Sequence, residues 1–227
     1  MMAKESKYSV VIVAGGKGLR AGGDMPKQFQ SVRGIPILMR TINQFYLFDN
    51  SIEIVVVLPE GYHDFWIELC EQHHFTVGHT LTVGGETRFH SVRNGLLKVN
   101  KDSIVAIHDA ARPFVPIDVI KRCYNEAESF QCGVIPVIEE KNSVRVMHGY
   151  DSLSFDRSKL RIVQTPQTFP ASLILNAYDL PFSSSYTDDA SVADAAGIQI
   201  KLVEGDEVNI KITTPYDLKI AEFLVGL

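Results

Sequence analysis

The sequence predicts an α/β fold, Rossmann-like, with a mostly parallel twisted sheet, helices on both faces and a protruding β-hairpin arm. Short runs of β-branched residues alternate with longer stretches at helical spacing. These runs are apolar throughout, as in strands that are buried on both faces. The chain has 227 residues, 45% of them hydrophobic, and no linker, repeat or low-complexity tract divides it. We therefore expect a single domain over residues 1–227.

The first part of the chain alternates regularly between the two kinds of element. In order, we expect a strand at 10–13, a helix at 36–48 begun by a proline, a strand at 53–58 stopped by Pro59, a helix at 62–73, a strand at 81–83, a helix at 88–99, a strand at 104–107, a helix at 116–130 and a strand at 134–137. Functional sites in such sheets lie beyond the carboxyl ends of the strands.

The alternation breaks near residue 139. Segments 143–148 and 152–156 flank Gly149-Tyr150-Asp151, which predicts a β-hairpin within an arm of about residues 139–160. A two-stranded hairpin is marginal alone in water, so it is either packed on a second subunit, which favours a homodimer with exchanged arms, or a mobile surface loop. Beyond it we expect a strand at 161–164, helices at 171–179 and 190–196, a strand at 209–212 and an amphipathic helix at 215–225.

Composition excludes several classes of function. The formal net charge of −5 argues against a nucleic-acid polymer as partner. No apolar run is long enough to span a bilayer, and the N-terminal apolar run is too short for a signal peptide. The three cysteines, Cys70, Cys123 and Cys132, form no C-x-x-C pair, so we expect reduced thiols in a cytoplasmic protein.

A glycine-rich loop directly follows the first predicted strand. The segment Ala14-Gly15-Gly16-Lys17-Gly18-Leu19-Arg20 is followed by Pro26-Lys27-Gln28. Glycines let backbone N–H groups approach an anion, and Lys17, Arg20 and Lys27 place cations around them. This pattern favours a bound phosphate, and a polyphosphate above all. The alternative is a tight turn with solvated lysines.

Two familiar phosphate-binding motifs do not fit the loop. Residues 16–21 match G-x-G-x-x-A, but the acidic residue expected about 20 positions later is missing, because that region is predicted helix. The P-loop pattern G-x-x-x-x-G-K-[ST] is absent.

Gly84-Gly85-Glu86-Thr87-Arg88, with Ser91 one turn later, precedes another predicted helix. Its backbone N–H groups suit the edge of a nucleobase, with Arg88 and Ser91 together at the helix start. An ordinary cap region, with Glu86 and Thr87 as capping residues, explains the same residues.

The segment His108-Asp109-Ala110-Ala111-Arg112-Pro113 follows a buried strand. Asp109 at the sheet edge suits Mg²⁺, and Arg112 suits a phosphate. The alternative is an Asp109–Arg112 ion pair that fixes a loop. His108 has no histidine or cysteine partner at metal-binding spacing, so we expect it to be structural.

Further polar residues are weak signals one by one. Arg157 and Lys211 are cations in polar segments, and Thr165 and Thr187 are hydroxyls near predicted helix starts. Thr187 also suits a helix N-cap.

Together and in order, these motifs strongly resemble the 2-C-methyl-D-erythritol 4-phosphate cytidylyltransferases. The resemblance covers residues 10–223 and rests on Ala-Gly-Gly-Lys-Gly-Leu-Arg, Pro-Lys-Gln, Gly-Gly-Glu-Thr-Arg, His-Asp-Ala-Ala-Arg-Pro, Thr-Pro-Gln, Thr-Asp-Asp-Ala and Asn-Ile-Lys-Ile-Thr. No cyclodiphosphate synthase domain follows these motifs, so we expect a monofunctional enzyme. The ribitol 5-phosphate cytidylyltransferases share most of the motifs.

The resemblance implies cytidylyl transfer from CTP with Mg²⁺, in the non-mevalonate pathway of isoprenoid precursors. By position, it implies catalytic Arg20 and Lys27, substrate-positioning Arg157 and Lys211, nucleotide contacts from Ala14, Gly15, Gly16, Gly85, Glu86, Ser91 and Ala110, and sugar-phosphate or metal contacts from Asp109, Arg112, Thr165 and Thr187. Arg88 joins the nucleotide set from its place at the helix start. The hairpin would be a dimer arm whose Arg157 reaches the partner's site.

The chain departs from the family pattern at Val13, where proline is usual, at Gly15, where alanine is usual, at Glu86, where aspartate is usual, and at Ser143, where threonine is usual. These changes affect fine nucleotide contacts rather than the class of reaction. Two other hypotheses stay open: the same chemistry on ribitol 5-phosphate or another polyol phosphate, and a nucleotide-binding sensor without activity. The joint presence of Arg20, Lys27 and Asp109 favours an enzyme over a sensor.

Overall fold

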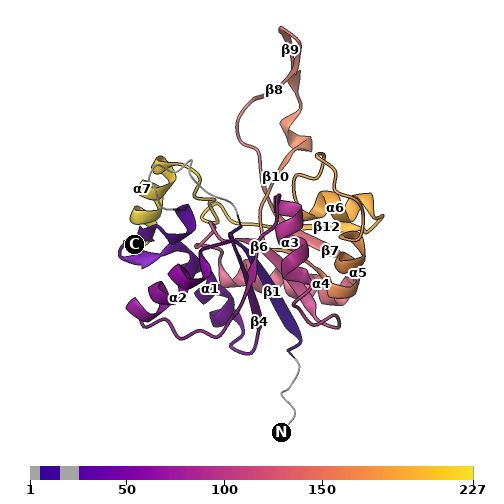
Figure 1. Cartoon of the computed structure of the whole chain (residues 1–227). Helices are drawn as coiled ribbons and strands as arrows, with labels where there is room; N and C mark the ends of the chain where they lie inside the picture. Colours follow the sequence, from indigo (N-terminus) through magenta and orange to yellow (C-terminus); the bar gives the residue numbers. More distant parts are fainter. Residues whose placement is uncertain (1–5, 16–25, 227) are drawn as a thin grey trace.

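A computed structural model describes residues 6–15 and 26–226 of the chain. Its centre is an eight-stranded sheet, in which β1 (Tyr8–Val13) lies between β4 (Glu53–Leu58) and β6 (Ile104–Asp109) (Figure 1). These three strands are parallel, and β5 (Thr80–Val83) extends the parallel set beyond β4. The parallel core confirms the predicted fold class.

The other half of the sheet contains the antiparallel strands. Strand β11 (Gln167–Pro170) runs antiparallel to β6 and to the start of β7 (Gly133–Glu139), and β10 (Arg161–Val163) pairs antiparallel with the end of β7. Strand β12 (Ile200–Glu204) is parallel to β7. The sheet is therefore mixed on this side, and mostly parallel as a whole.

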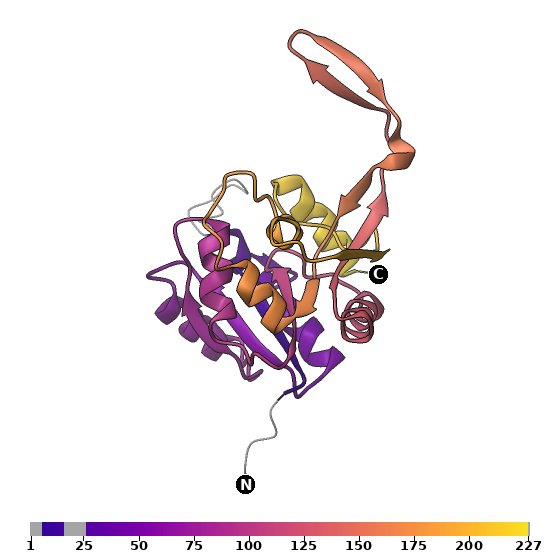
Figure 2. The ribbon, with the colours of Figure 1, turned by 90° about the vertical axis from the view of Figure 1, so that its right-hand side faces the viewer.

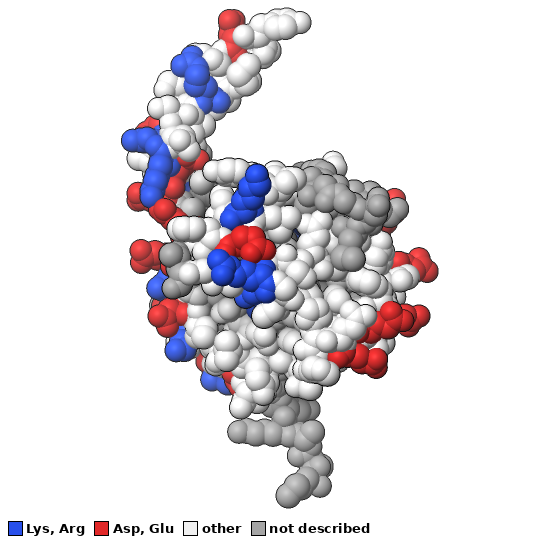
Figure 3. Space-filling model, turned by 90° about the vertical axis from the view of Figure 1, so that its left-hand side faces the viewer, with Lys and Arg blue, Asp and Glu red and all other residues white. Residues whose placement is uncertain are grey.

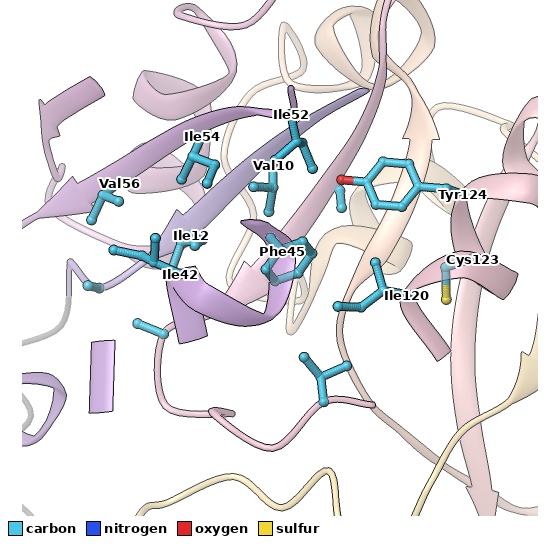
Figure 4. Packing of buried hydrophobic residues seen from close by; sticks show 14 of the residues in the cluster. Val10, Ile12, Ile42, Phe45, Ile52, Ile54, Val56, Ile120, Cys123 and Tyr124 are labelled. Atoms are coloured by element: carbon cyan, nitrogen blue, oxygen red, sulfur yellow. The ribbon is translucent and has the colours of Figure 1, made fainter. Parts of the chain in front are cut away.

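The apolar strands pack on both faces because successive side chains point to opposite sides. Val10 and Ile12 of β1 belong to one hydrophobic cluster, whereas Val11 between them belongs to another on the opposite face. Figure 4 shows the first cluster, where Val10 and Ile12 face Phe45 and Ile120 from the covering helices.

Helices cover each face of the sheet. Helices α1 (Ile37–Phe48), α2 (His63–Gln72) and α4 (Ile117–Phe130) contribute to the first cluster. Helices α3 (Arg88–Leu96), α5 (Ala171–Ala177) and α6 (Asp189–Ala195) contribute to the second. Helix α7 (Pro215–Leu224) packs near the small hairpin of β2 (Ser31–Val32) and β3 (Ile35–Pro36), which follows η2 (Lys27–Phe29). None of the helices in the described residues is long and apolar enough to cross a membrane.

The predicted arm is present as a hairpin that projects from the body (Figures 1 and 2). Strands β8 (Val144–His148) and β9 (Asp151–Phe155) pair only with each other, and η3 (Arg157–Lys159) leads back to β10. Met147 and Leu153 on the arm are 65% and 62% exposed. Lys and Arg side chains occur at several places along it (Figure 3). The arm thus presents apolar and basic side chains that no other described part of the chain covers.

One expected strand is absent from the described part of the chain, and four strands observed there, β2, β3, β11 and β12, were not predicted. Residues 209–212 form no strand: Ile212 donates its N–H to the carbonyl of Ala111, and its side chain packs beside α7. The last strand is β12, which we did not predict because only Val203 of its five residues is buried. An edge strand with one buried residue lacks the apolar run by which we recognised the others.

Helix boundaries differ in smaller ways. Helix α3 ends at Leu96, three residues before the expected end. Helix α6 begins at Asp189, and its N-cap is Asp188 in a capping box with Ser191, so the expectation of a Thr187 cap was wrong. Aspartate and threonine both suit this position, so the sequence could not decide which of the two caps the helix.

Candidate active site

The candidate site lies at the carboxyl ends of β1, β5 and β6. The chain runs from β1 outward through β4 to β5 and then returns to β6 on the other side of β1. This reversal of strand order opens a crevice beyond the strand ends, where doubly wound sheets bind ligands. The segments after β1, β5 and β6 are the three that carry the sequence motifs.

Glycines of two loops meet on one side of the site. A Cβ on Gly15 would lie 2.7 Å from Ser91 Oγ, and a Cβ on Gly84 would lie 3.3 Å from Gly15 Cα. Ser91 Oγ accepts the Gly85 N–H at 3.0 Å and donates to the Thr87 carbonyl at 3.0 Å. The loops after β1 and β5 therefore touch at glycines, where a side chain would have to displace Ser91 or the facing loop.

Gly85→Ala is expected to weaken CTP binding by about tenfold or more, because the new Cβ would lie 2.4 Å from His90 Cβ and 3.0 Å from the His90 backbone carbon, so the Gly85 N–H must move away from Ser91 Oγ. Isothermal titration with CTP measures this. Gly78→Ala is the matched control, since nothing lies within 4 Å of a Cβ at Gly78. Equal affinities for the two variants would show that the close packing of Gly85 on the start of α3 has no role in binding CTP.

The Pro-Lys-Gln segment is fastened to the first loop. Gln28 is buried, and its Nε2 donates to the carbonyl of Ala14 at 2.9 Å. Ala14 in turn donates its N–H to Val57 of β4. Lys27, the first residue of η2, is thereby held next to the end of β1. Gly16 and Arg20 lie outside the described residues.

A cluster of charges surrounds Asp109 at the end of β6. Lys211 Nζ lies 2.8 Å and Arg112 Nε 3.4 Å from Asp109 Oδ2, and Arg88 Nε lies 3.7 Å from Asp109 Oδ1. Burial alone would raise the pKa of Asp109, but the charges of Arg88, Lys211 and Arg112 outweigh it and hold that pKa well below its usual range. Asp109 is therefore ionised at neutral pH. The Asp109–Arg112 ion pair of the structural alternative is present too.

Arg88 links this cluster to a second carboxylate. Its Nη1 and Nη2 donate to the two oxygens of Asp189 at 2.8 and 2.7 Å, as a bidentate pair. Asp189 is fully buried and also accepts the hydroxyl of Tyr178 at 2.6 Å. Arg112 is fixed likewise, since its Nη1 donates to the Asn209 carbonyl at 2.7 Å.

His108 is a buried structural histidine, as expected. Its Nε2 lies 3.1 Å from the carbonyl of Arg112, which can only accept, so Nε2 carries the proton. Its Nδ1 then accepts from the hydroxyl of Thr165, which itself accepts the Asp109 N–H at 3.1 Å. Burial lowers the pKa of His108 to about 4, so the ring is neutral at pH 7. His108 thus ties together the backbone around Asp109, Arg112 and Thr165.

The structure brings most of the expected residues to one edge of the sheet and leaves three outside the contacts just described. Ala110 joins the site through its N–H, which bonds to the Val13 carbonyl, and through its carbonyl, which accepts from Thr41. Glu86 and Thr187 are exposed. Arg157 lies on the arm, where it donates to the carbonyl of Lys141.

Sequence reasoning gave no role to three residues that hold the site together: Gln28, Thr41 and Asp189. Gln28 and Asp189 stand inside motifs that we quoted, so their presence in the motifs was a usable signal. Thr41 lies in α1, far from any motif, and its bond to the carbonyl of Ala110 becomes visible only in three dimensions.

The residues at the site fit a magnesium ion that is held mainly by its substrate. No group of three His, Cys, Asp or Glu side chains within residues 6–15 and 26–226 is arranged to hold a metal. Mg²⁺ needs only one or two carboxylates when phosphates and water complete its shell. Asp109 is ionised, and Arg88 Nε, at 3.7 Å from its Oδ1, is too far away to hydrogen-bond that oxygen. It is therefore the carboxylate that suits the ion.

The parallel sheet, the glycine loops at its switch point and the cations beside them define a nucleotidyltransferase, and comparison with known proteins agrees. The sequence model of the 2-C-methyl-D-erythritol 4-phosphate cytidylyltransferases matches residues 8–226. The chain belongs to this family.

Relatives in sequence and in structure cover almost the whole chain. The enzyme of that name from Bacteroides thetaiotaomicron is 49% identical over 219 residues, which are 96% of this chain and all of the relative. The one from Phocaeicola vulgatus is 50% identical over 95% of this chain and 98% of its own length. The crystal structure of 4-diphosphocytidyl-2C-methyl-D-erythritol synthase from Anaerococcus prevotii superposes with a TM-score of 0.81 at 26% identity, covering 97% of this chain and 96% of that one.

Proposed function

We propose that this chain transfers a cytidylyl group from CTP to 2-C-methyl-D-erythritol 4-phosphate and releases pyrophosphate, in the non-mevalonate pathway of isoprenoid precursors. The observation that carries the proposal is the cluster of Arg88, Arg112 and Lys211 around Asp109, beside the glycine contact of Gly15 and Gly84. Cations beside a glycine loop suit two polyanionic substrates that must be brought together.

The reaction needs no general base. An oxygen of the acceptor's phosphate attacks the α-phosphorus of CTP in line, and the bond from that phosphorus to the β-phosphate breaks as pyrophosphate leaves. The attacking oxygen is already anionic at pH 7. Catalysis therefore consists of positioning and of stabilising charge in the transition state.

The nucleotide half of the site comes from the loops after β1 and β5. We assign CTP contacts to Ala14, Gly15, Gly16, Gly85, Glu86, Arg88, Ser91 and Ala110. Backbone N–H groups that approach closely at the glycines suit phosphates and a base edge. Arg20 and Lys27 would stabilise the charge that develops on the α-phosphate.

The acceptor half of the site comes from the charge cluster and the arm. We assign the sugar phosphate to Asp109, Arg112, Thr165 and Thr187, and its alignment for attack to Arg157 and Lys211. Asp109 would hold Mg²⁺, which neutralises phosphate charge when bound.

A homodimer with exchanged arms would complete each site. The exposed apolar side chains of the arm support this, because a hairpin of two strands needs a surface to pack on. Arg157 on the arm of one subunit would then act at the site of the other. Cys70, Cys123 and Cys132 are free thiols, which supports a location in the reducing cytoplasm.

Nucleotide selectivity tests the assignment of the glycine loops. With the methylerythritol phosphate acceptor held constant, pyrophosphate release is expected to be far faster from CTP than from ATP, GTP or UTP. Purine triphosphates used as well as CTP would contradict base recognition at Gly85 and Ser91.

A further inference from the structure

We infer that Asp189 is a positioning residue for the transferase reaction: it holds Arg88 in place and, through Arg88, sets the charge and orientation of Asp109. Asp189 touches none of the groups assigned to substrates except Arg88. This inference rests on the function proposed above.

The geometry is a chain of alternating charges that runs from the interior to the site. Tyr178 donates to Asp189, Asp189 accepts both Nη groups of Arg88, and Arg88 Nε lies 3.7 Å from Asp109 Oδ1. Lys211 then takes the other oxygen of Asp109 at 2.8 Å. The exposed end of this chain of charges is Lys211, whose side chain is 41% exposed.

The turn that carries Asp189 is held in place by groups other than the Asp189 carboxylate. Asp189 is the first residue of α6, and the cap of that helix is made by the neighbouring Asp188 with Ser191, so the Asp189 carboxylate is not needed for capping. Gln167 fixes the same turn, since its Oε1 accepts the Ala190 N–H and its Nε2 donates to Asp188. The turn is held by other groups, and the Asp189 carboxylate is left for Arg88 and Tyr178.

The consequence of losing this carboxylate follows from the charges. Without the Asp189 carboxylate, the half-buried Arg88 loses its bidentate partner, and the nearest remaining carboxylate is Asp109. A guanidinium that turns onto Asp109 competes with Lys211 and Arg112 for its oxygens. The acceptor half of the site would then lose its arrangement, whereas the contacts of Ser91 with Gly85 would not change.

Asp189→Asn keeps the shape of the side chain and removes its charge. We expect a fall in kcat of ~10–100-fold, as is typical when a residue that orients a site residue is lost, and a higher KM for the acceptor. The KM for CTP should rise less than the KM for the acceptor, because Asp189 reaches the nucleotide half of the site only through Arg88, while the contact of Ser91 with Gly85 stays in place. Steady-state kinetics with both substrates measure these values, and circular dichroism confirms that the protein is folded at the assay temperature.

Two further variants separate positioning from folding. Tyr178→Phe is the matched control: it also removes a buried hydrogen bond to Asp189 Oδ1 but leaves Arg88 paired with the carboxylate. Its kcat should stay within about twofold of wild type. In Arg88→Met/Asp189→Asn no charge is left buried without its partner. If Asp189 acts only through Arg88, this double variant is no less active than the weaker of Arg88→Met and Asp189→Asn.

The outcomes distinguish this inference from the proposed function. An active wild type with Asp189→Asn folded and unchanged in kcat would overturn the inference alone, and so would losses that multiply in the double variant. If Asp189→Asn does not fold, a double variant as active as wild type overturns it. An inactive wild type would overturn the proposed function, and the inference with it.

Discussion

Lys27→Ala is expected to lower kcat by ~10²–10³-fold, the loss typical of removing one donor that stabilises charge in the transition state. The structure gives this lysine a fixed place, because the neighbouring Gln28 is hydrogen-bonded to the carbonyl of Ala14 at the end of β1. The charge that Lys27 meets develops only as the acceptor oxygen adds to the α-phosphorus. The KM for CTP should therefore change much less than kcat.

Stopped-flow detection of pyrophosphate at saturating substrates measures this effect. Lys98→Ala is the control, since Lys98 is exposed after the end of α3, and its kcat should match wild type. A Lys27→Ala enzyme with normal kcat and only weaker CTP binding would show that Lys27 binds CTP in the ground state and does not stabilise the transition state.

Activity is expected to return when two inactive variants exchange subunits. If Arg157 acts at the partner's site, each site combines Lys27 of one subunit with Arg157 of the other. In a mixed dimer of Lys27→Ala and Arg157→Ala chains, one site carries both lesions and the other carries neither. Random exchange makes about half of the dimers mixed, so activity should recover to roughly a quarter of wild type in a two-fold dimer.

A mixture of Lys27→Ala with Lys211→Ala chains is the matched control. We place these two lysines in the same site of the same chain, so every site in the mixed dimer keeps one lesion and activity stays low. Subunit exchange is verified by native mass spectrometry. No recovery with Arg157→Ala, despite confirmed exchange, would place Arg157 in the site of its own chain.

The parallel core could be predicted because burial on both faces leaves a strong signal. The segment Glu53–Leu58 is apolar after its first residue, and its predicted limits agree with β4. The hairpin of β8 and β9 was also predicted, from the glycine between its two segments. In the structure Gly149 adopts the positive φ that such a turn requires. Strand β12 was not predicted because it is an edge strand with a single buried residue, and its structure depends on pairing with β7.

Some features of the site could likewise be predicted from the sequence, and others could not. Asp109, Arg112 and Lys211 could be proposed from motifs, but their mutual contact depends on how segment 209–213 folds back along the loop after β6. Our prediction of a strand there was wrong, even though Lys211 itself meets Asp109. Asp189 shows the limit most clearly, since Arg88 and Asp189 are 101 positions apart and become partners only because the fold brings the first residues of α3 and α6 together.

One measurement tests the central claim most directly: the purified protein is incubated with CTP, Mg²⁺ and one polyol phosphate at a time, and both pyrophosphate and the CDP-linked polyol product are quantified. We predict one pyrophosphate per product, and turnover of 2-C-methyl-D-erythritol 4-phosphate far above that of ribitol 5-phosphate. Equal or faster turnover of ribitol 5-phosphate would contradict the proposed acceptor, and no product from any polyol phosphate would contradict cytidylyl transfer.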